Sequence, residues 1–158
     1  MTKRMLIALL SLIGTFVAIY LAAYKLGWLG ALSCSVGSCE TVQLSPWAIF
    51  LGLPVAVWGV GFYVVTLGVV MLGVQERFAD SRTISLALVG LTGWGLLFSA
   101  WLTYLELFVI HAICQWCVVS AIIVLGLFIL SVMDLREFGG EGEKAVVSGQ
   151  SSVLKTDH

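Results

Sequence analysis

Four long apolar segments constrain this chain more than any other feature of its sequence. They cover residues 5–24, 54–74, 83–104 and 113–133. Each is close to the roughly 20 apolar residues that a helix needs to cross about 30 Å of hydrocarbon. Apolar residues make up 60% of the 158-residue chain and charged residues 11%, which excludes a disordered chain, and a net charge of −1 excludes a basic nucleic-acid-binding surface. The sequence therefore predicts an all-α integral membrane protein, a bundle of four transmembrane helices.

Positive charges are distributed unevenly between the two ends of these predicted helices. Seven of the eight lysines and arginines fall on the side of the N-terminus, and only Lys25 falls on the other. Because positive charge favours the cytoplasmic side, we expect both termini in the cytoplasm and the segments 25–53 and 105–112 on the outer face. We also expect a short interfacial helix over Pro46–Leu53, anchored by Trp47, and a mobile cytoplasmic tail over residues 135–158.

The first apolar segment also has the features of a signal peptide. Lys3 and Arg4 precede it, and cleavage near Leu21-Ala22-Ala23 is the alternative. Its apolar stretch is longer than the roughly 7–15 residues of a signal h-region, so we expect a retained first helix.

All four cysteines fall on the predicted outer side of the membrane. Cys34 and Cys39 lie in the first outer loop, beside Gly37 and serines that suggest a flexible segment. Cys114 and Cys117 form a C-x-x-C at the start of the last helix, where spacing brings the sulfurs together and the helix N-terminus favours a thiolate. Two pairs on an oxidising face indicate a relay of electrons by successive disulfide exchange.

Three other interpretations of these cysteines compete with the relay, and the sequence argues against one of them. The two pairs together have the ligand types of a zinc site, and they also fit inert structural disulfides. A haem attachment site would need a histidine after the second cysteine, where the chain has Val118.

A membrane quinone is the expected electron acceptor at Cys117, which lies deeper in its helix than Cys114. Six aromatic residues are candidates for the walls of its pocket: Trp58, Phe62, Trp94, Phe98, Trp101 and Trp116. Of these, proximity favours Trp116 as a quinone-binding residue, and interfacial anchoring is the alternative for the others. Glu106 and His111 are candidates to relay protons, and interfacial solvation is their alternative.

Two motifs in this order resemble the vitamin K epoxide reductase family, over roughly residues 5–133. The first runs through Cys34…Gly37-Ser38-Cys39-Glu40…Val42…Ser45-Pro46-Trp47-Ala48…Gly52-Leu53-Pro54. The second is the stretch 103–117, TYLELFVIHAICQWC, which is similar to the bacterial signature that leads into the C-x-x-C.

The resemblance implies a four-helix bundle around a quinone such as menaquinone or ubiquinone. It implies that Cys114 and Cys117 are the active-site pair, and that Cys34 and Cys39 are a shuttle pair that takes electrons from a thioredoxin-fold protein. Ser45 would belong to a cap over the quinone. We prefer Cys39 as the partner of Cys114 in the transient disulfide.

The chain departs from the family pattern in two respects. We expect a member without a fused thioredoxin-like domain, located in a bacterial inner (plasma) membrane and served by a separate exported, DsbA-like partner. Animal members have Asn near Val55 and Tyr at Ala121, and the change favours plain quinone reduction over epoxide reduction. The alternatives are a DsbB-type quinone-linked oxidase, in which the C-x-x-C lies in the first outer loop, and a non-enzymatic scaffold with static disulfides.

Overall fold

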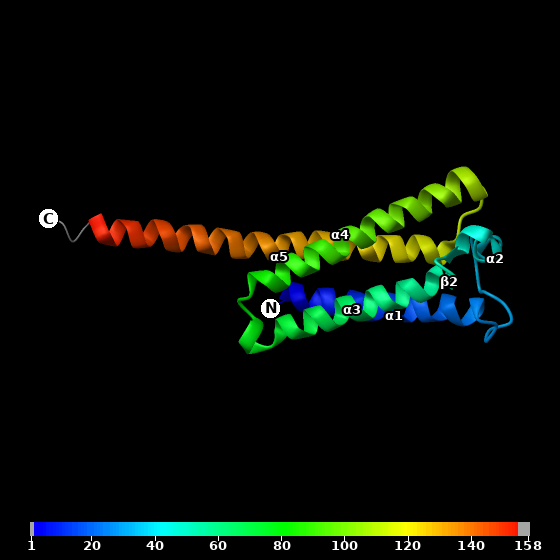
Figure 1. The fold of residues 1–158 in the computed structure, drawn as a ribbon, viewed down its shortest axis with the longest axis horizontal. Coiled ribbons are helices and arrows are strands. Elements are labelled where there is room, and N and C mark those ends of the chain that lie inside the picture. Colours follow the sequence, from blue (N-terminus) through cyan, green and yellow to red (C-terminus); the bar gives the residue numbers. More distant parts are fainter. Residues whose placement is uncertain (1, 155–158) are drawn as a thin grey trace.

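The computed structural model describes the backbone of residues 2–154, and the side chains of all of these except 138, 141–145 and 150–154 (Figure 1). The helices are α1 (Thr2–Lys25), α2 (Cys39–Leu44), α3 (Val55–Val74), α4 (Arg82–Leu105) and α5 (Gln115–Leu154). The shorter elements are η1 (Pro46–Ala48), β1 (Ile49–Phe50), β2 (Leu53–Pro54), η2 (Glu76–Phe78) and η3 (Glu106–Ile110), of which η3 is a π-helical turn.

Four of the described helices are long and apolar enough to cross a membrane. They are Thr2–Lys25, Val55–Val74, Arg82–Ile110 and Gln115–Glu137. A helix suits these segments because it satisfies every interior backbone group within the segment itself, as a hydrocarbon environment requires. The predicted fold class, an all-α membrane bundle of four spanning helices, is confirmed.

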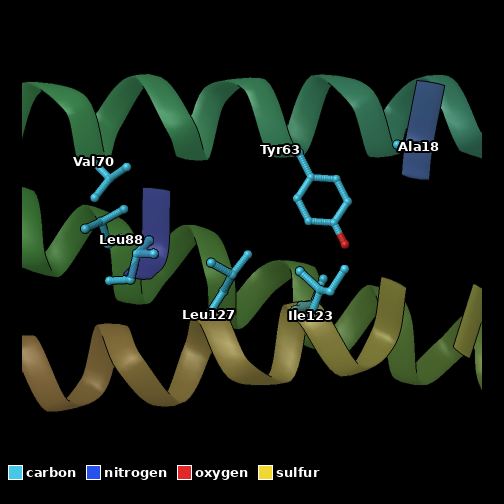
Figure 2. Packing of buried hydrophobic residues seen from close by; sticks show 8 residues of the cluster. Ala18, Tyr63, Val70, Leu88, Ile123 and Leu127 are labelled. Carbon is cyan, nitrogen blue, oxygen red and sulfur yellow. The ribbon is translucent and has the colours of Figure 1, made fainter. Parts of the chain in front are cut away.

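Buried side chains from all four long helices meet along the axis of the bundle. Figure 2 shows Tyr63 extending from α3 toward Ile123 of α5, with Val70, Leu88 and Leu127 further along the same core. Tyr63 fits because α1 has a glycine opposite it: a Cβ atom at Gly14 would lie 2.3 Å from the Tyr63 ring. The tyrosine hydroxyl hydrogen-bonds Ser120 Oγ at 2.7 Å, so its polar end is satisfied inside the bundle.

A buried ion pair joins the helices near the N-terminal end of the bundle. Arg4 of α1 and Asp134 of α5 are each 5% exposed, and Arg4 Nε lies 3.3 Å from the carboxylate. The guanidinium also donates to the Gly73 carbonyl of α3 and to Ser85 Oγ of α4. Ser85 in turn donates to the Asp134 carboxylate at 2.6 Å. One charged network therefore connects all four spanning helices.

Asp134→Asn is expected to lower the free energy of unfolding by about 3–5 kcal/mol, because Arg4 would keep a buried charge without its carboxylate. Glu137→Gln is the matched control, since it also removes a carboxylate from α5. The Glu137 side chain is 63% exposed and, among the described residues, is bonded only to Lys3. Unfolding in mixed detergent micelles measures both. Equal losses in the two variants would contradict a special role for the buried pair.

The first outer loop contains a short helix, as predicted, but its bounds differ from the prediction. The helix is α2, before Pro46, and within the predicted range a single 3₁₀ turn, η1, leads into the hairpin β1–β2. Leu51 and Gly52 both have positive φ, which a two-residue hairpin turn requires. The backbone of the tail continues α5 as helix as far as Leu154, and residues 155–158 lie outside the described residues; the mobility of the tail stays a prediction.

Candidate functional site

The four cysteines come together at the end of the bundle opposite the N-terminus. Figure 1 shows α2 and β2 at this end, with the N-terminus and the extension of α5 toward the other. Cys34 and Cys39 are joined by a disulfide bond, whereas Cys114 and Cys117 are free thiols. Cys39 is 1% exposed and Cys114 is fully buried in the same apolar cluster, against which Cys34 and Cys117 pack. The shuttle pair and the active-site pair predicted from the sequence are therefore neighbours.

Cys114 occupies the position immediately before the first residue of α5. Its sulfur accepts a hydrogen bond from the backbone N–H of Cys117 at 3.4 Å, as a capping side chain does at a helix N-terminus. The hydrogen bond from the Cys117 side chain holds the pKa of the Cys114 thiol below its ordinary value. Cys114 is thus the member of the pair that is suited to form a thiolate and to exchange disulfides.

The loop between Cys34 and Cys39 lies directly against the C-x-x-C segment. Gly37 and Cys114 form an isolated β-bridge, and Ser38 N–H donates to the Ile113 carbonyl at 2.9 Å. The sequence suggests a flexible segment at Gly37, and the structure gives a more specific reason why this position is a glycine. Its φ is +87°, and a Cβ atom there would lie 2.2 Å from the Ile113 oxygen, so this approach requires glycine.

Cys117 lines a cavity of about 780 Å³ between α3, α4 and α5, which lies within the roughly 300–1,000 Å³ range of small-molecule sites. The lining is mainly apolar and aromatic, and it includes Trp58, Phe62, Trp94 and Phe98. Trp94 is 70% exposed, so one wall of the cavity reaches the surface of the spanning helices. An apolar cavity of this size beside a thiol fits the ring of a lipid-soluble quinone.

Polar groups in the cavity gather around Cys117. Gln43 of α2, itself buried, donates from its amide nitrogen to Cys117 Sγ at 3.8 Å. Glu106, 6% exposed at the start of η3, interacts with the Cys117 thiol and accepts the backbone N–H of Cys114 at 3.2 Å. Tyr63 and Ser120 line the cavity as a hydrogen-bonded pair. The site thus has a hydrogen-bond donor and a carboxyl group at the sulfur.

The hairpin β1–β2 and η1 cover the outer end of the cavity. The Phe50 ring packs edge-on against Trp58, Phe98 and Trp101, with centroids 5.6–6.2 Å apart. Trp58 Nε1 donates to the Phe50 carbonyl at 3.0 Å, which fixes the hairpin to α3. Ser45, predicted from the resemblance to belong to the cap, lines the cavity and donates from its hydroxyl to the Val42 carbonyl.

Three residues singled out in the sequence lie elsewhere. Trp116 does not line the cavity; its ring packs on Tyr20, with centroids 5.2 Å apart. Trp101 is outside the lining as well, although it contacts Phe50. His111 is exposed, has a φ of 55° and bonds the Val109 carbonyl. The proton-relay hypothesis is therefore kept for Glu106, and the quinone-binding hypothesis for Trp116 is not carried further.

Three polar residues of the site were not singled out from the sequence: Gln43, Tyr63 and Ser120. Ser120 could have been predicted from its position three residues after Cys117, because residues at this spacing share one face of a helix. Gln43 had a weaker signal, a polar residue in the loop four positions after Cys39. Tyr63 sits in an uninterrupted apolar run and reads as core.

Residues 5–132 match the model of the vitamin K epoxide reductase family. The chain belongs to this family. It is accordingly a multi-pass membrane thiol-disulfide oxidoreductase. Members of the vitamin K epoxide reductase family use quinones as electron partners and work with thioredoxin-like proteins. Among the described residues, no group of three or more His, Cys, Asp or Glu is placed to hold a metal ion.

Proposed function

We propose that this protein oxidises an exported, DsbA-like thioredoxin-fold protein and passes the electrons through two cysteine pairs to a membrane quinone. One observation carries the proposal: Cys117 lines the apolar cavity, while its neighbour Cys114 lies buried beneath the loop that holds the Cys34–Cys39 disulfide. The two pairs therefore lie in series between the surface and the cavity.

The first step transfers two electrons from the partner to the shuttle pair. A thiolate of the reduced partner attacks Cys34, which is half-buried, whereas Cys39 is 1% exposed. The Cys34–Cys39 bond breaks and a mixed disulfide with the partner forms. The partner's second thiol then displaces Cys34, so the partner leaves as a disulfide and the shuttle pair is a dithiol.

The second step moves these electrons to the active-site pair in its disulfide form. Cys39 attacks Cys114, a bond forms between them, and Cys117 leaves as a thiolate that takes up a proton to become a thiol. Cys34 then attacks Cys39, which restores the shuttle disulfide and releases Cys114. The burial of Cys39 and Cys114 in one apolar cluster supports Cys39 as the attacking residue.

The third step takes place at Cys117. A quinone bound in the cavity supplies an acceptor for two electrons and two protons. Gln43 stabilises negative charge on Cys117 Sγ through its amide, and Glu106 takes up the proton of the Cys117 thiol beside the cavity. As Cys114 bonds to Cys117 and the active-site disulfide is restored, the two electrons of the pair would pass to the bound quinone together with two protons, one of them by way of Glu106.

The lining of the cavity favours plain quinone reduction over epoxide reduction. Val55 and Ala121, the positions at which the resemblance places Asn and Tyr in animal members, both line the cavity and are apolar here. Ser45 in the cap and the Tyr63–Ser120 pair are among the hydroxyl groups in the lining that could orient a quinone.

We place the protein in a bacterial inner membrane with both termini cytoplasmic and the cysteines at the outer face. The distribution of charge supports this orientation: Arg77 and Arg82 flank the connection between α3 and α4, and Arg136 lies near the inner end of the spanning part of α5 (Gln115–Glu137), whereas Lys25 is the basic residue near the cysteines. A reporter protein that is active only in the cytoplasm is expected to be active when it is fused after residue 154.

The purified protein is expected to reduce quinone anaerobically with a reduced thioredoxin-fold protein as donor. A Cys34→Ser/Cys39→Ser double variant should lose this activity by on the order of 10²-fold or more, because the variant offers the thiolate of the partner no shuttle disulfide to attack. Quinone reduction driven by dithiothreitol should remain. The double variant avoids a dead-end Cys39–Cys114 disulfide. Glu40→Gln, a change at an exposed neighbour of Cys39, is the control. A lack of turnover in the wild-type protein with several donors and quinones would favour static disulfides.

A further inference from the structure

The two residues between the active-site cysteines point away from the cavity and toward the shuttle loop. The side-chain oxygen of Gln115 accepts the backbone N–H groups of Ser35 and Val36, at 3.0 and 3.3 Å. Trp116 Nε1 donates to the Ser33 carbonyl at 2.9 Å. Neither residue lines the cavity.

The residue just before Cys34 is held on both of its backbone groups. While Trp116 of α5 binds the Ser33 carbonyl, the Tyr20 hydroxyl of α1 accepts the Ser33 N–H at 3.0 Å. The rings of Tyr20 and Trp116 pack edge to face, so each aromatic side chain orients the other. We call Tyr20, Gln115 and Trp116 the clasp.

The clasp and the backbone bridge together fix the whole disulfide loop. Five of the six residues from Ser33 through Ser38 are held by these contacts: the clasp binds at 33, 35 and 36, Gly37 bridges Cys114, and Ser38 N–H bonds the Ile113 carbonyl. These contacts cover Cys114, which is fully buried. They hold Cys39 in the cluster that contains Cys114.

We propose that Gln115 and Trp116 are positioning residues that hold the shuttle loop against Cys114 and thereby set the rate of internal disulfide exchange. The inference rests on the proposed function above and assigns to the C-x-x-C motif a second task. Exchange between two cysteines in one protein depends on their effective concentration, which rises when both are held in place. In the exchange itself, the Cys39–Cys114 bond forms as the Cys114–Cys117 bond breaks.

The first test measures this effective concentration without a quinone or a partner. In a Cys34→Ser/Cys117→Ser protein only Cys39 and Cys114 remain, and the fraction that forms their disulfide in a glutathione buffer is read by mass spectrometry. Gln115→Met removes the acceptor but keeps the length of the side chain, and should lower the effective concentration about tenfold, while Gln115→Glu keeps an acceptor oxygen and should stay near wild type. Trp116→Phe keeps the aromatic contact but loses one donor and should have a smaller effect.

The loop side gives a second matched pair. Gly37→Ala places a Cβ atom 2.2 Å from the Ile113 oxygen, and should lower the effective concentration, whereas Gly30→Ala in the same outer segment meets nothing within 4 Å and should not. Equal values for Gln115→Met and Gln115→Glu, or no change in any variant, would overturn the proposal.

Turnover assays separate this proposal from the proposed function. With wild-type cysteines, Gln115→Met should slow quinone reduction by the thioredoxin-fold donor, and should leave the dithiothreitol-driven rate equal or higher because Cys114 is less covered. A misfolded variant would lose both activities. A wild-type protein inactive with both donors would refute the proposed function, while the glutathione measurement would still decide the role of the clasp.

Discussion

The Cys117→Ser variant is expected to lose quinone reduction with every electron donor, by on the order of 10³-fold or more. Cys117 is the free cysteine that lines the cavity, and a serine hydroxyl does not ionise or form a disulfide under the same conditions. The variant should still accept electrons at the shuttle disulfide, because that site is separate. Anaerobic quinol formation with a thioredoxin-fold donor and with dithiothreitol measures the loss.

In the same variant Cys114 can attack Cys39 of the shuttle disulfide, so that a Cys39–Cys114 bond forms as the Cys34–Cys39 bond breaks and Cys34 leaves as a thiol. This mixed disulfide should accumulate, since no Cys117 remains to displace Cys39 from Cys114. Mass spectrometry of the alkylated protein identifies this bond. Val118→Ala is the matched control, because Val118 is the next residue of α5 and is 39% exposed. Retention of quinone reduction by Cys117→Ser would show that the terminal cysteine is wrongly assigned.

Much of the fold follows from local sequence patterns. The predicted span 54–74 matches α3 (Val55–Val74) within one residue, and the predicted span 5–24 lies inside α1 (Thr2–Lys25). A long apolar segment in hydrocarbon is stable as a spanning helix, so the boundaries of the helix can be predicted directly from the sequence. The segment Pro46–Leu53 is short and has no such constraint, so the sequence predicts a short helix in this loop but not its bounds.

The parts of the site that the sequence did not predict depend on contacts between distant residues. Gln43 reaches Cys117 across 74 positions, and Gln115 reaches Ser35 across 80. Trp116 shows the same limit, because its place next to Cys117 in sequence suggested the cavity, whereas on α5 it turns to Tyr20 and Ser33. Adjacent positions on a helix point in different directions, and only the packed bundle determines which one meets the cavity.

Glu106→Gln is expected to slow quinone reduction by about 10²–10⁴-fold with both donors, the usual contribution of a general base. Glu106 is buried at the cavity, interacts with the Cys117 thiol and accepts the Cys114 N–H. Glutamine has the same size and still offers an oxygen to that N–H, so the change mainly removes proton transfer. Because Cys117 would then lose its proton to solvent hydroxide, the residual rate should rise with pH more steeply than the wild-type rate.

His111→Asn provides the control that separates the two proton carriers predicted from the sequence. His111 is exposed and has a φ of 55°, a conformation that asparagine tolerates well, so its replacement should leave turnover unchanged. A loss in His111→Asn with full activity in Glu106→Gln would move the proton pathway from the cavity to the surface. The alternative that Glu106 serves only to hold Cys114 predicts a different result: Glu106→Gln would keep its activity, because the amide oxygen preserves the bond to the Cys114 backbone.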